Sequence, residues 1–291
     1  MATARKTKLG IALIQFDTKP GLKETLQHLS EMVEQAVSKY CPRVISVQEG
    51  FNYFYQSDKG VFENAGEPIN GPTAQHMSGL AKRFNIYLIG GIAETDNGKL
   101  YNTALVFNPN GELIARHRKV NLCDIDFANG TKLDEVNVFT PGDEVTIFKI
   151  DDIQCGLVIC WDACYDEFIK IYRKLGVEVL FVPAAYDILG GDKYSLHNYW
   201  EIVHKARAFD NQMFVAAISG ARNEKVKDYV LYGHTMLIDP QGKILKQAGV
   251  NEEIVFQEID VAVLVKLYKE FPTFRLRRKD IYEKYSGIYT C

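Results

Sequence analysis

The sequence lacks a long apolar run: no hydrophobic stretch approaches the roughly 18–20 residues that a membrane-spanning helix requires. The first residues, Met1 to Lys8, are basic but too few and too polar for a secretory signal. A large excess of either charge is also missing, since the net charge of the 291 residues is −3. We therefore expect neither a membrane nor nucleic acid as a partner. We expect a cytoplasmic location, with a mitochondrial one as the alternative.

Motifs for metals and nucleotides are missing too. The six histidines form no HxxxH or HExxH pair, and the cysteines form no CxxC pair. No GxGxxG follows a predicted strand, and neither a P-loop nor a GxSxG motif occurs. We therefore predict no metal site, and no nucleotide-binding motif is present. The six cysteines read as free thiols in a reducing compartment; they are Cys41, Cys123, Cys155, Cys160, Cys164 and Cys291.

What the sequence does contain is a regular alternation of apolar strands and amphipathic helices. Strands are predicted at 9–16, 44–47, 86–92, 145–150, 154–160, 177–182, 213–219 and 254–259, and helices at 22–40, 74–84, 168–175 and 198–210. Two hairpins are predicted at 101–120 and 233–247, whereas 121–143 reads as irregular. No linker divides the chain, so we predict a single α/β domain over 1–291 with a weak internal two-fold repeat.

Three reactive side chains stand at the ends of predicted strands, where ligands gather in such folds. Cys160 follows an apolar strand and precedes a helix from about Glu167, a position that favours a thiolate and frees the Trp161 N–H to bind an oxyanion. Glu49 is a candidate general base, and Lys119 could hold the thiolate and stabilise an oxyanion. Taken singly, each has a structural alternative: a core cysteine, a solvated carboxylate and an exposed basic strand.

Together, these residues and their surroundings resemble the nitrilase, or carbon–nitrogen hydrolase, superfamily over nearly the whole chain. The resemblance is carried by 48–52 (QEGFN), 117–122 (HRKVNL) and 156–162 (GLVICWD), supported by 100–103 (LYNT), 140–143 (TPGD) and 205–211 (KARAFDN). Several segments in the family's order make this far more specific than any one motif.

The resemblance implies a four-layer αββα sandwich that forms dimers or larger assemblies, without metal or organic cofactor. It implies Glu49 as base, Lys119 as oxyanion stabiliser and Cys160 as nucleophile, cleaving a small-molecule amide through a thioester. It further implies support from Glu135 and Trp161. The substrate-pocket candidates are Phe51, Asn52, Cys164 and Tyr186, and the tail from about 261 to 291 is expected to make subunit contacts.

Within the superfamily the chain is most similar to the Nit branch, which includes ω-amidases acting on amides of α-keto dicarboxylic acids. Three positions depart from that pattern: Gln48 replaces a usual Pro, Cys164 a usual Arg, and Asp166 a Pro or small residue. Loss of the Arg removes a bidentate partner for a substrate carboxylate. Substrate class therefore stays open, with an N-carbamoyl amine amidohydrolase, a nitrilase, an acyl transferase and a non-catalytic binding relative as alternatives.

Overall fold

The computed structural model describes residues 5–53, 64–126, 132–188, 196–223, 225–226 and 229–286. Two six-stranded sheets dominate the fold, and each is a mixed sheet with three parallel strands at its centre. None of the helices in these ranges is long and apolar enough to cross a membrane.

The first sheet has the strand order β14-β1-β2-β3-β4-β5. Strands β1, β2 and β3 run parallel, while β14, β4 and β5 are antiparallel to their neighbours. The strands are β1 (Lys8–Gln15), β2 (Val44–Ser46), β3 (Tyr87–Asp96), β4 (Lys99–Phe107), β5 (Leu113–Arg118) and β14 (Glu253–Asp260).

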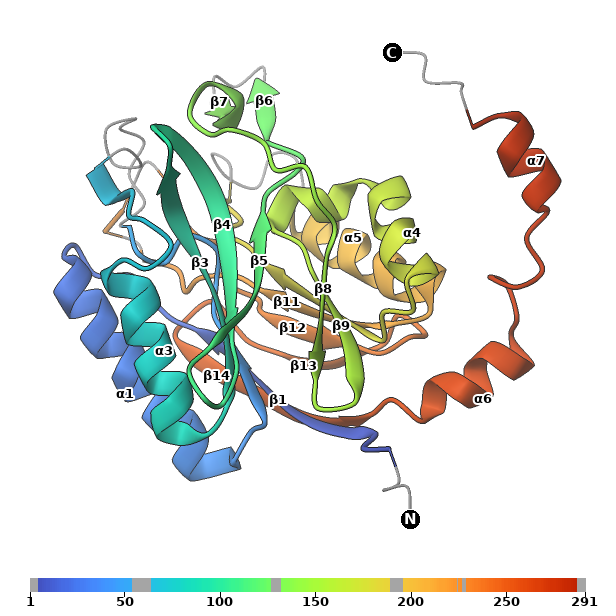
Figure 1. Cartoon of the computed structure of the whole chain (residues 1–291), viewed down its shortest axis with the longest axis horizontal. Coiled ribbons are helices and arrows are strands. Elements are labelled where there is room, and N and C mark those ends of the chain that lie inside the picture. The colour runs from blue at the N-terminus through green and yellow to red at the C-terminus, as the bar shows by residue number, and fades with distance from the viewer. Residues whose placement is uncertain are drawn as a thin grey trace.

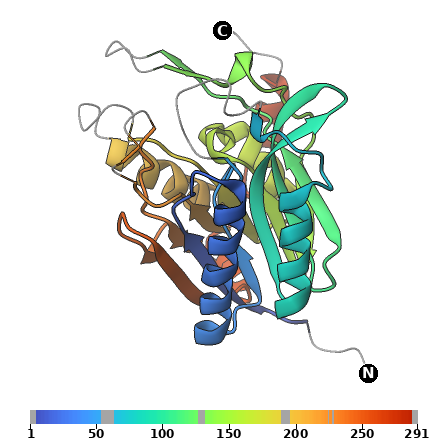
Figure 2. The ribbon, with the colours of Figure 1, turned by 90° about the vertical axis from the view of Figure 1, so that its left-hand side faces the viewer.

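Two helices, α1 (Leu22–Tyr40) and α3 (Pro72–Phe84), cover the outer face of this sheet and lie side by side in Figure 2. α1 forms because its apolar residues recur at helical spacing, so that Leu29, Met32, Val33 and Ala36 are all buried on one face. It ends where Cys41 adopts the left-handed conformation with φ 49°. The predicted helix 22–40 is confirmed at both ends.

The second sheet repeats this plan with the order β13-β12-β11-β10-β9-β8. Its outer face packs against α4 (Asp166–Lys174) and α5 (Leu196–Asn211). The strands are β8 (Thr146–Ile150), β9 (Ile153–Leu157), β10 (Val179–Pro183), β11 (Phe214–Ile218), β12 (Met236–Ile238) and β13 (Ile244–Gln247). The shared strand order supports the internal repeat that the sequence suggested.

The inner faces of the two sheets pack on each other across a shared core, to which strands of both halves contribute (Figure 1). Leu13 and Ile89 of the first sheet meet Phe181 and Ile218 of the second, and all four are almost fully buried. A separate apolar layer lies between each sheet and its helices. The order helix, sheet, sheet, helix confirms the predicted αββα sandwich.

The structure corrects two local predictions and adds two helices in the tail. The stretch 121–143 contains a two-stranded hairpin, β6 (Asp124–Asp126) and β7 (Lys132–Asp134), followed by the 3₁₀ helix η1 (Glu135–Asn137). The strand predicted to reach residue 160 ends at Leu157, and the 3₁₀ helix η2 (Cys160–Cys164) follows, with the next helix beginning at Asp166. The tail forms α6 (Val263–Glu270) and α7 (Lys279–Lys284), which run along one side of the molecule in Figure 1.

Candidate active site

The candidate catalytic residues come from three strand ends in two sheets. Glu49 lies just beyond β2 and Lys119 directly after β5, both in the first sheet, whereas Cys160 follows β9 in the second. Glu49 and Lys119 are only 3% and 2% exposed, so neither is the solvated side chain that its structural alternative required. A Cβ on Gly91 would lie 2.5 Å from the Gly50 nitrogen, so glycine there lets β3 approach the loop of Glu49 closely.

A buried lysine links the acidic side chains. Lys119 Nζ lies 3.0 Å from Glu49 Oε1 and 2.7 Å from Glu135 Oε2. Asn102 Nδ2 donates to the same Glu49 oxygen at 2.6 Å, and the Ala185 N–H donates to Glu49 Oε2 at 2.7 Å. Donors therefore fix both oxygens of Glu49, and the cluster of one ammonium and two carboxylates is held rigidly.

Cys160 lies beside this cluster, and its thiol interacts electrostatically with Glu49, Lys119 and Glu135. Burial raises the pKa of the thiol, and the charge of Glu49 adds to this more than Lys119 offsets, so the pKa lies well above its ordinary value. These effects favour the neutral thiol in the resting site, so a base must take its proton before or during attack. A short 3₁₀ helix and one lysine shared by two carboxylates do not offset the cost of burying a charge.

The other two charged groups show how strongly the pKa values in the cluster are coupled. Burial opposes the charged form of Lys119, but Glu135 and Glu49 outweigh it and raise the pKa well above its usual value. Burial also raises the pKa of Glu135, against the opposing charge of Lys119. Both carboxylates thus favour the ammonium form of Lys119.

The backbone at Cys160 has a conformation that few residues adopt. Its φ is 44°, in the left-handed region, which is uncommon for a residue with a side chain. This turn ends the strand and begins η2, leaving the residue half-buried. No described residue accepts a hydrogen bond from the Trp161 backbone N–H. The Trp161 indole Nε1 donates to the Tyr165 hydroxyl at 3.2 Å.

Asp162 connects the segment that carries Cys160 to the segment that carries Lys119. It is fully buried. One oxygen, Oδ1, accepts from the backbone N–H groups of Val120 and Asn121 at 3.2 and 2.7 Å and from Asn121 Nδ2 at 3.0 Å. The other, Oδ2, accepts from the Ile159 N–H and lies 3.0 Å from His117 Nε2. One carboxylate thereby fixes the chain on both sides of the candidate site.

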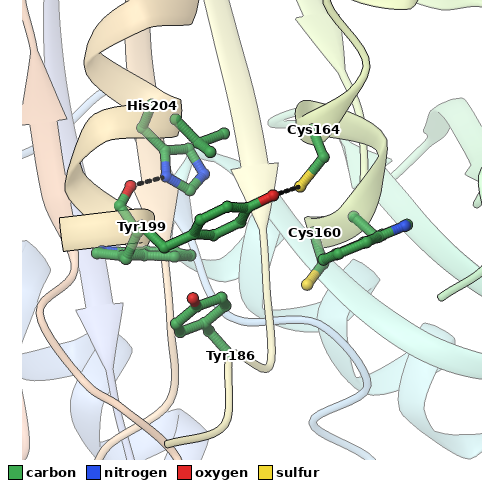
Figure 3. Close-up of a pocket in the computed structure, with 8 residues that line it drawn as sticks. Cys160, Cys164, Tyr186, Tyr199 and His204 are labelled. Carbon is green, nitrogen blue, oxygen red and sulfur yellow. Dashed lines mark hydrogen bonds between the residues drawn. The ribbon is translucent and has the colours of Figure 1, made fainter. Parts of the chain in front are cut away.

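The predicted pocket residues separate into two groups. Phe51 is fully buried in the core between the first sheet and its helices, and Asn52 hydrogen-bonds Glu67 Oε1 at 2.9 Å and the Ala93 N–H at 3.0 Å. Both therefore have structural contacts away from the pocket next to the thiol. Cys164 and Tyr186 do lie there (Figure 3), in a small pocket that is lined by Cys160, Trp161, Cys164, Tyr186, Tyr199, Trp200, Val203 and His204.

Several of these residues were not singled out from the sequence. Asn102 lies in a recognised stretch, LYNT, and Asp162 in CWD, so the motifs marked their positions but not their contacts. Tyr199, Trp200 and His204 stand on α5 at positions that read as ordinary helix. Their only sequence signal is a cluster of aromatic residues directly before the matched stretch 205–211.

Known proteins resemble this chain over most of its length. Residues 10–269 match the family model described as "Carbon-nitrogen hydrolase". The omega-amidase NIT2 of Bos taurus is 37% identical over 284 residues, 97% of this chain and 98% of that protein. Nit3 of Saccharomyces cerevisiae, a member of branch 10 of the nitrilase superfamily, superposes with a TM-score of 0.82 at 29% identity, covering 95% of this chain and 99% of that one.

A carbon–nitrogen hydrolase from Helicobacter pylori G27 superposes with a TM-score of 0.87 at 27% identity, and the match covers 97% of this chain and all of that chain. Both the family model and the relatives therefore extend over almost the full sequence. The chain belongs to the carbon–nitrogen hydrolase family of the nitrilase superfamily.

Proposed function

We propose that the protein is an amidase that hydrolyses a small-molecule amide through a thioester on Cys160. In this assignment Glu49 is the general base, Lys119 and the Trp161 N–H stabilise the oxyanion, and Glu135 positions the lysine. The observation that carries the proposal is the buried ammonium of Lys119, held between two carboxylates beside a neutral thiol. A buried charge of this kind is costly and is characteristic of functional sites.

The chemistry follows from the protonation states. Glu49 takes the proton of the Cys160 thiol as the sulfur attacks the amide carbon, so the thiolate forms only during attack. The carbonyl oxygen gains the negative charge and receives hydrogen bonds from Lys119 and from the Trp161 N–H. An ammonium has three donors; Glu49 and Glu135 accept from Lys119 Nζ, and we assign the remaining donor to the oxyanion.

Breakdown of the tetrahedral intermediate releases ammonia, which leaves with the proton that Glu49 returns to the nitrogen. The thioester on Cys160 remains. Glu49 then takes a proton from water, the hydroxide attacks the thioester, and the second intermediate collapses to the acid and the thiol. Glu49 is thus acid and base in turn, a role that suits a carboxylate fixed at both oxygens by Asn102, Lys119 and Ala185.

The reaction class that we propose is that of an omega-amidase, since proteins with this name are 34–37% identical to the chain over at least 94% of its length. Substrates with a nitrile or a carbamoyl group would use the same nucleophile but give different products. Measuring the ammonia and the acid released from amide, nitrile and carbamoyl compounds separates these alternatives.

Trapping the acyl group on the nucleophile tests the proposal. The protein is mixed with primary amides, quenched in acid and digested with trypsin, and the acyl mass is expected on Cys160. Cys155 and Cys164 share its tryptic peptide, 150–170, so fragment ions must locate the adduct. The variant Cys160→Ala should form no adduct, whereas Cys41→Ser, at an exposed thiol, should form it normally. An adduct on another cysteine would overturn the assignment.

We also propose that the chain forms a homo-oligomer in which the tail contributes subunit contacts. Val265 and Leu276 of this tail are 69% and 68% exposed, and Ile202 on α5 is 62% exposed. In an oligomer, these apolar side chains could be buried in the contact between subunits. The five described cysteines are free thiols, which supports a reducing compartment, the cytoplasm or alternatively the mitochondrion. The oligomer is measured by light scattering of the full chain against a chain that ends at residue 262.

A further inference from the structure

The carboxylate of Glu49 is held from both halves of the molecule. Its Oε1 accepts from Asn102 Nδ2 at 2.6 Å and from Lys119 Nζ at 3.0 Å, and both of these residues come from the first half. Its Oε2 accepts from the Ala185 N–H at 2.7 Å, and Ala185 follows β10 in the second sheet. A carboxylate that is held at one oxygen can still turn about its last bond, because that torsion has only broad preferences. The Ala185 N–H therefore contributes the second point that defines the plane of the base.

Ala185 and Cys160 extend from neighbouring strands of the second sheet. β9 and β10 pair in parallel, and the Val158 N–H donates to the Phe181 carbonyl oxygen at 3.1 Å. Because neighbouring parallel strands end at the same edge of a sheet, the N–H that orients the base lies at the same edge as the thiol that the base serves. The orientation of Glu49 is thus tied to the half of the fold that carries the nucleophile.

Segment 229–232 holds the stretch 185–188 after it leaves β10. The Tyr229 hydroxyl donates to the Ala185 carbonyl oxygen at 2.7 Å, so residue 185 is bonded on both sides, to Glu49 through its N–H and to Tyr229 through its C=O. Backbone hydrogen bonds also join the two segments, from the Ile188 N–H to the Val230 carbonyl oxygen at 2.9 Å and from the Tyr232 N–H to that of Tyr186 at 2.7 Å.

The surroundings of Tyr229 favour its hydrogen bond. The ring packs against a buried apolar cluster that includes Ala185 and Leu231. Burial raises the pKa of the Tyr229 hydroxyl well above its usual value, and the charge of Asp187 adds to this, so the hydroxyl keeps its proton and donates. A hydrogen bond that is shielded from water in this way is stronger than one at the surface. Tyr229 also interacts electrostatically with Glu49, so it lies near the base that it would influence.

We propose that Tyr229 is a positioning residue of the amidase, which acts through Ala185 on the orientation of Glu49. Its hydroxyl holds the carbonyl group of Ala185, and the N–H of the same residue then stays directed at Glu49 Oε2. This inference rests on the proposed function, because it takes Glu49 as the general base. It adds a residue from a segment far along the chain to those that fix the base.

Removing the hydroxyl alone tests the proposal. Tyr229→Phe keeps the ring in its apolar cluster, so the variant is expected to fold. We expect kcat on a primary amide to fall about 10-fold with KM changed less than about 2-fold, because the base is misoriented and the pocket is unaltered. The matched control is Tyr268→Phe, which removes the same kind of bond, from a hydroxyl to the Gln212 carbonyl oxygen at 3.0 Å. Gln212 precedes β11, at the edge of the sheet away from the site, so kcat should stay unchanged there.

A double variant separates positioning from a general loosening of the fold. If Tyr229 acts through Glu49, its hydroxyl contributes nothing once the base is absent, so Tyr229→Phe with Glu49→Gln should have the kcat of Glu49→Gln within about 2-fold. A further fall of about 10-fold in the double variant, or an unchanged kcat in Tyr229→Phe alone, would overturn the positioning role. Normal turnover in Glu49→Gln alone would instead overturn the proposed function, so the two failures are distinguishable.

Discussion

Asp162 joins the two segments that bring Lys119 and Cys160 together, so its replacement by asparagine is expected to reduce both stability and turnover. The carboxylate accepts three hydrogen bonds at Oδ1 and one from the Ile159 N–H at Oδ2, where His117 Nε2 also lies 3.0 Å away. An asparagine can place its carbonyl oxygen at the Oδ1 position. Its NH₂ group then faces the Ile159 N–H, which loses its acceptor.

The cost can be worked out donor by donor. His117 adapts, because its Nδ1 lies 3.0 Å from the Thr146 hydroxyl, which can accept from it while Nε2 accepts from the new amide. Ile159 N–H cannot adapt, and a buried unsatisfied donor costs about 1–3 kcal/mol. The remaining bonds lose the strengthening that a charge provides. We expect Asp162→Asn to lower the free energy of unfolding by about 3 kcal/mol, and Asp162→Ala to lower it by more.

Turnover should fall further than stability alone explains. A displacement of about 1 Å between the thiol and the lysine can cost about 100-fold in rate, so kcat should drop by that factor while KM changes little. The assays are urea unfolding followed by fluorescence and ammonia release from a primary amide. Asp151→Asn, at the opposite end of β9, is the matched control: it breaks the ion pair with Arg43, costs about 1 kcal/mol and should leave kcat unchanged. If Asp162→Asn is less stable but has normal kcat, the link between the segments is not needed for catalysis.

Three further changes probe the site and the assembly. Glu49→Gln should lower kcat by about 10³-fold, yet shift the pH profile of Cys160 alkylation to lower pH, because the carboxylate charge that raises the thiol pKa is gone. Burial lowers the pKa of His204 to about 4 in the folded protein, so the folded state binds a proton less readily than the unfolded state does. The free energy of unfolding should therefore fall as the pH is lowered from about 6.5 to about 4. In His204→Gln, urea unfolding should show this loss of stability reduced by up to about 3 kcal/mol. Ile202→Glu should reduce the oligomer mass in light scattering with an unchanged circular dichroism spectrum, because it buries a charge in the proposed subunit contact.

The sequence predicted most of the strands and helices because their periodicity is a local property of the chain. It also placed Glu49, Lys119 and Cys160 at strand ends, where a shared edge could bring them together. The reversal at Cys160 was not predictable, because a left-handed φ at a residue with a side chain depends on tertiary contacts such as the Ile159 N–H to Asp162 bond. The short helices α6 and α7 were missed for a similar reason, since helices of eight and six residues are set by packing more than by propensity.

Contacts within the site could not be read from the sequence at all. Asn102 and Glu135 lie 33 residues apart, and both meet Lys119 or Glu49 only after the sheet and the hairpin β6–β7 have formed. The raised pKa of the Cys160 thiol was not foreseen for a related reason. Sequence showed the ammonium and the helix start but not the burial of the thiol, and burial is the larger influence on its pKa.

The two-sheet architecture explains why the site needs the whole fold. Each sheet alone would expose its inner face, and the packing of both buries the strand ends from which Glu49, Lys119 and Cys160 extend. One half supplies the acid and the amine, and the other supplies the thiol and the aromatic pocket. Burying a charged cluster at this junction lowers the free energy of unfolding, because the charges lose their contact with water, whereas an apolar cluster has no such cost. The shared core between the sheets offsets that cost, and because it fixes the distance between the halves, it also fixes the distance between base and nucleophile.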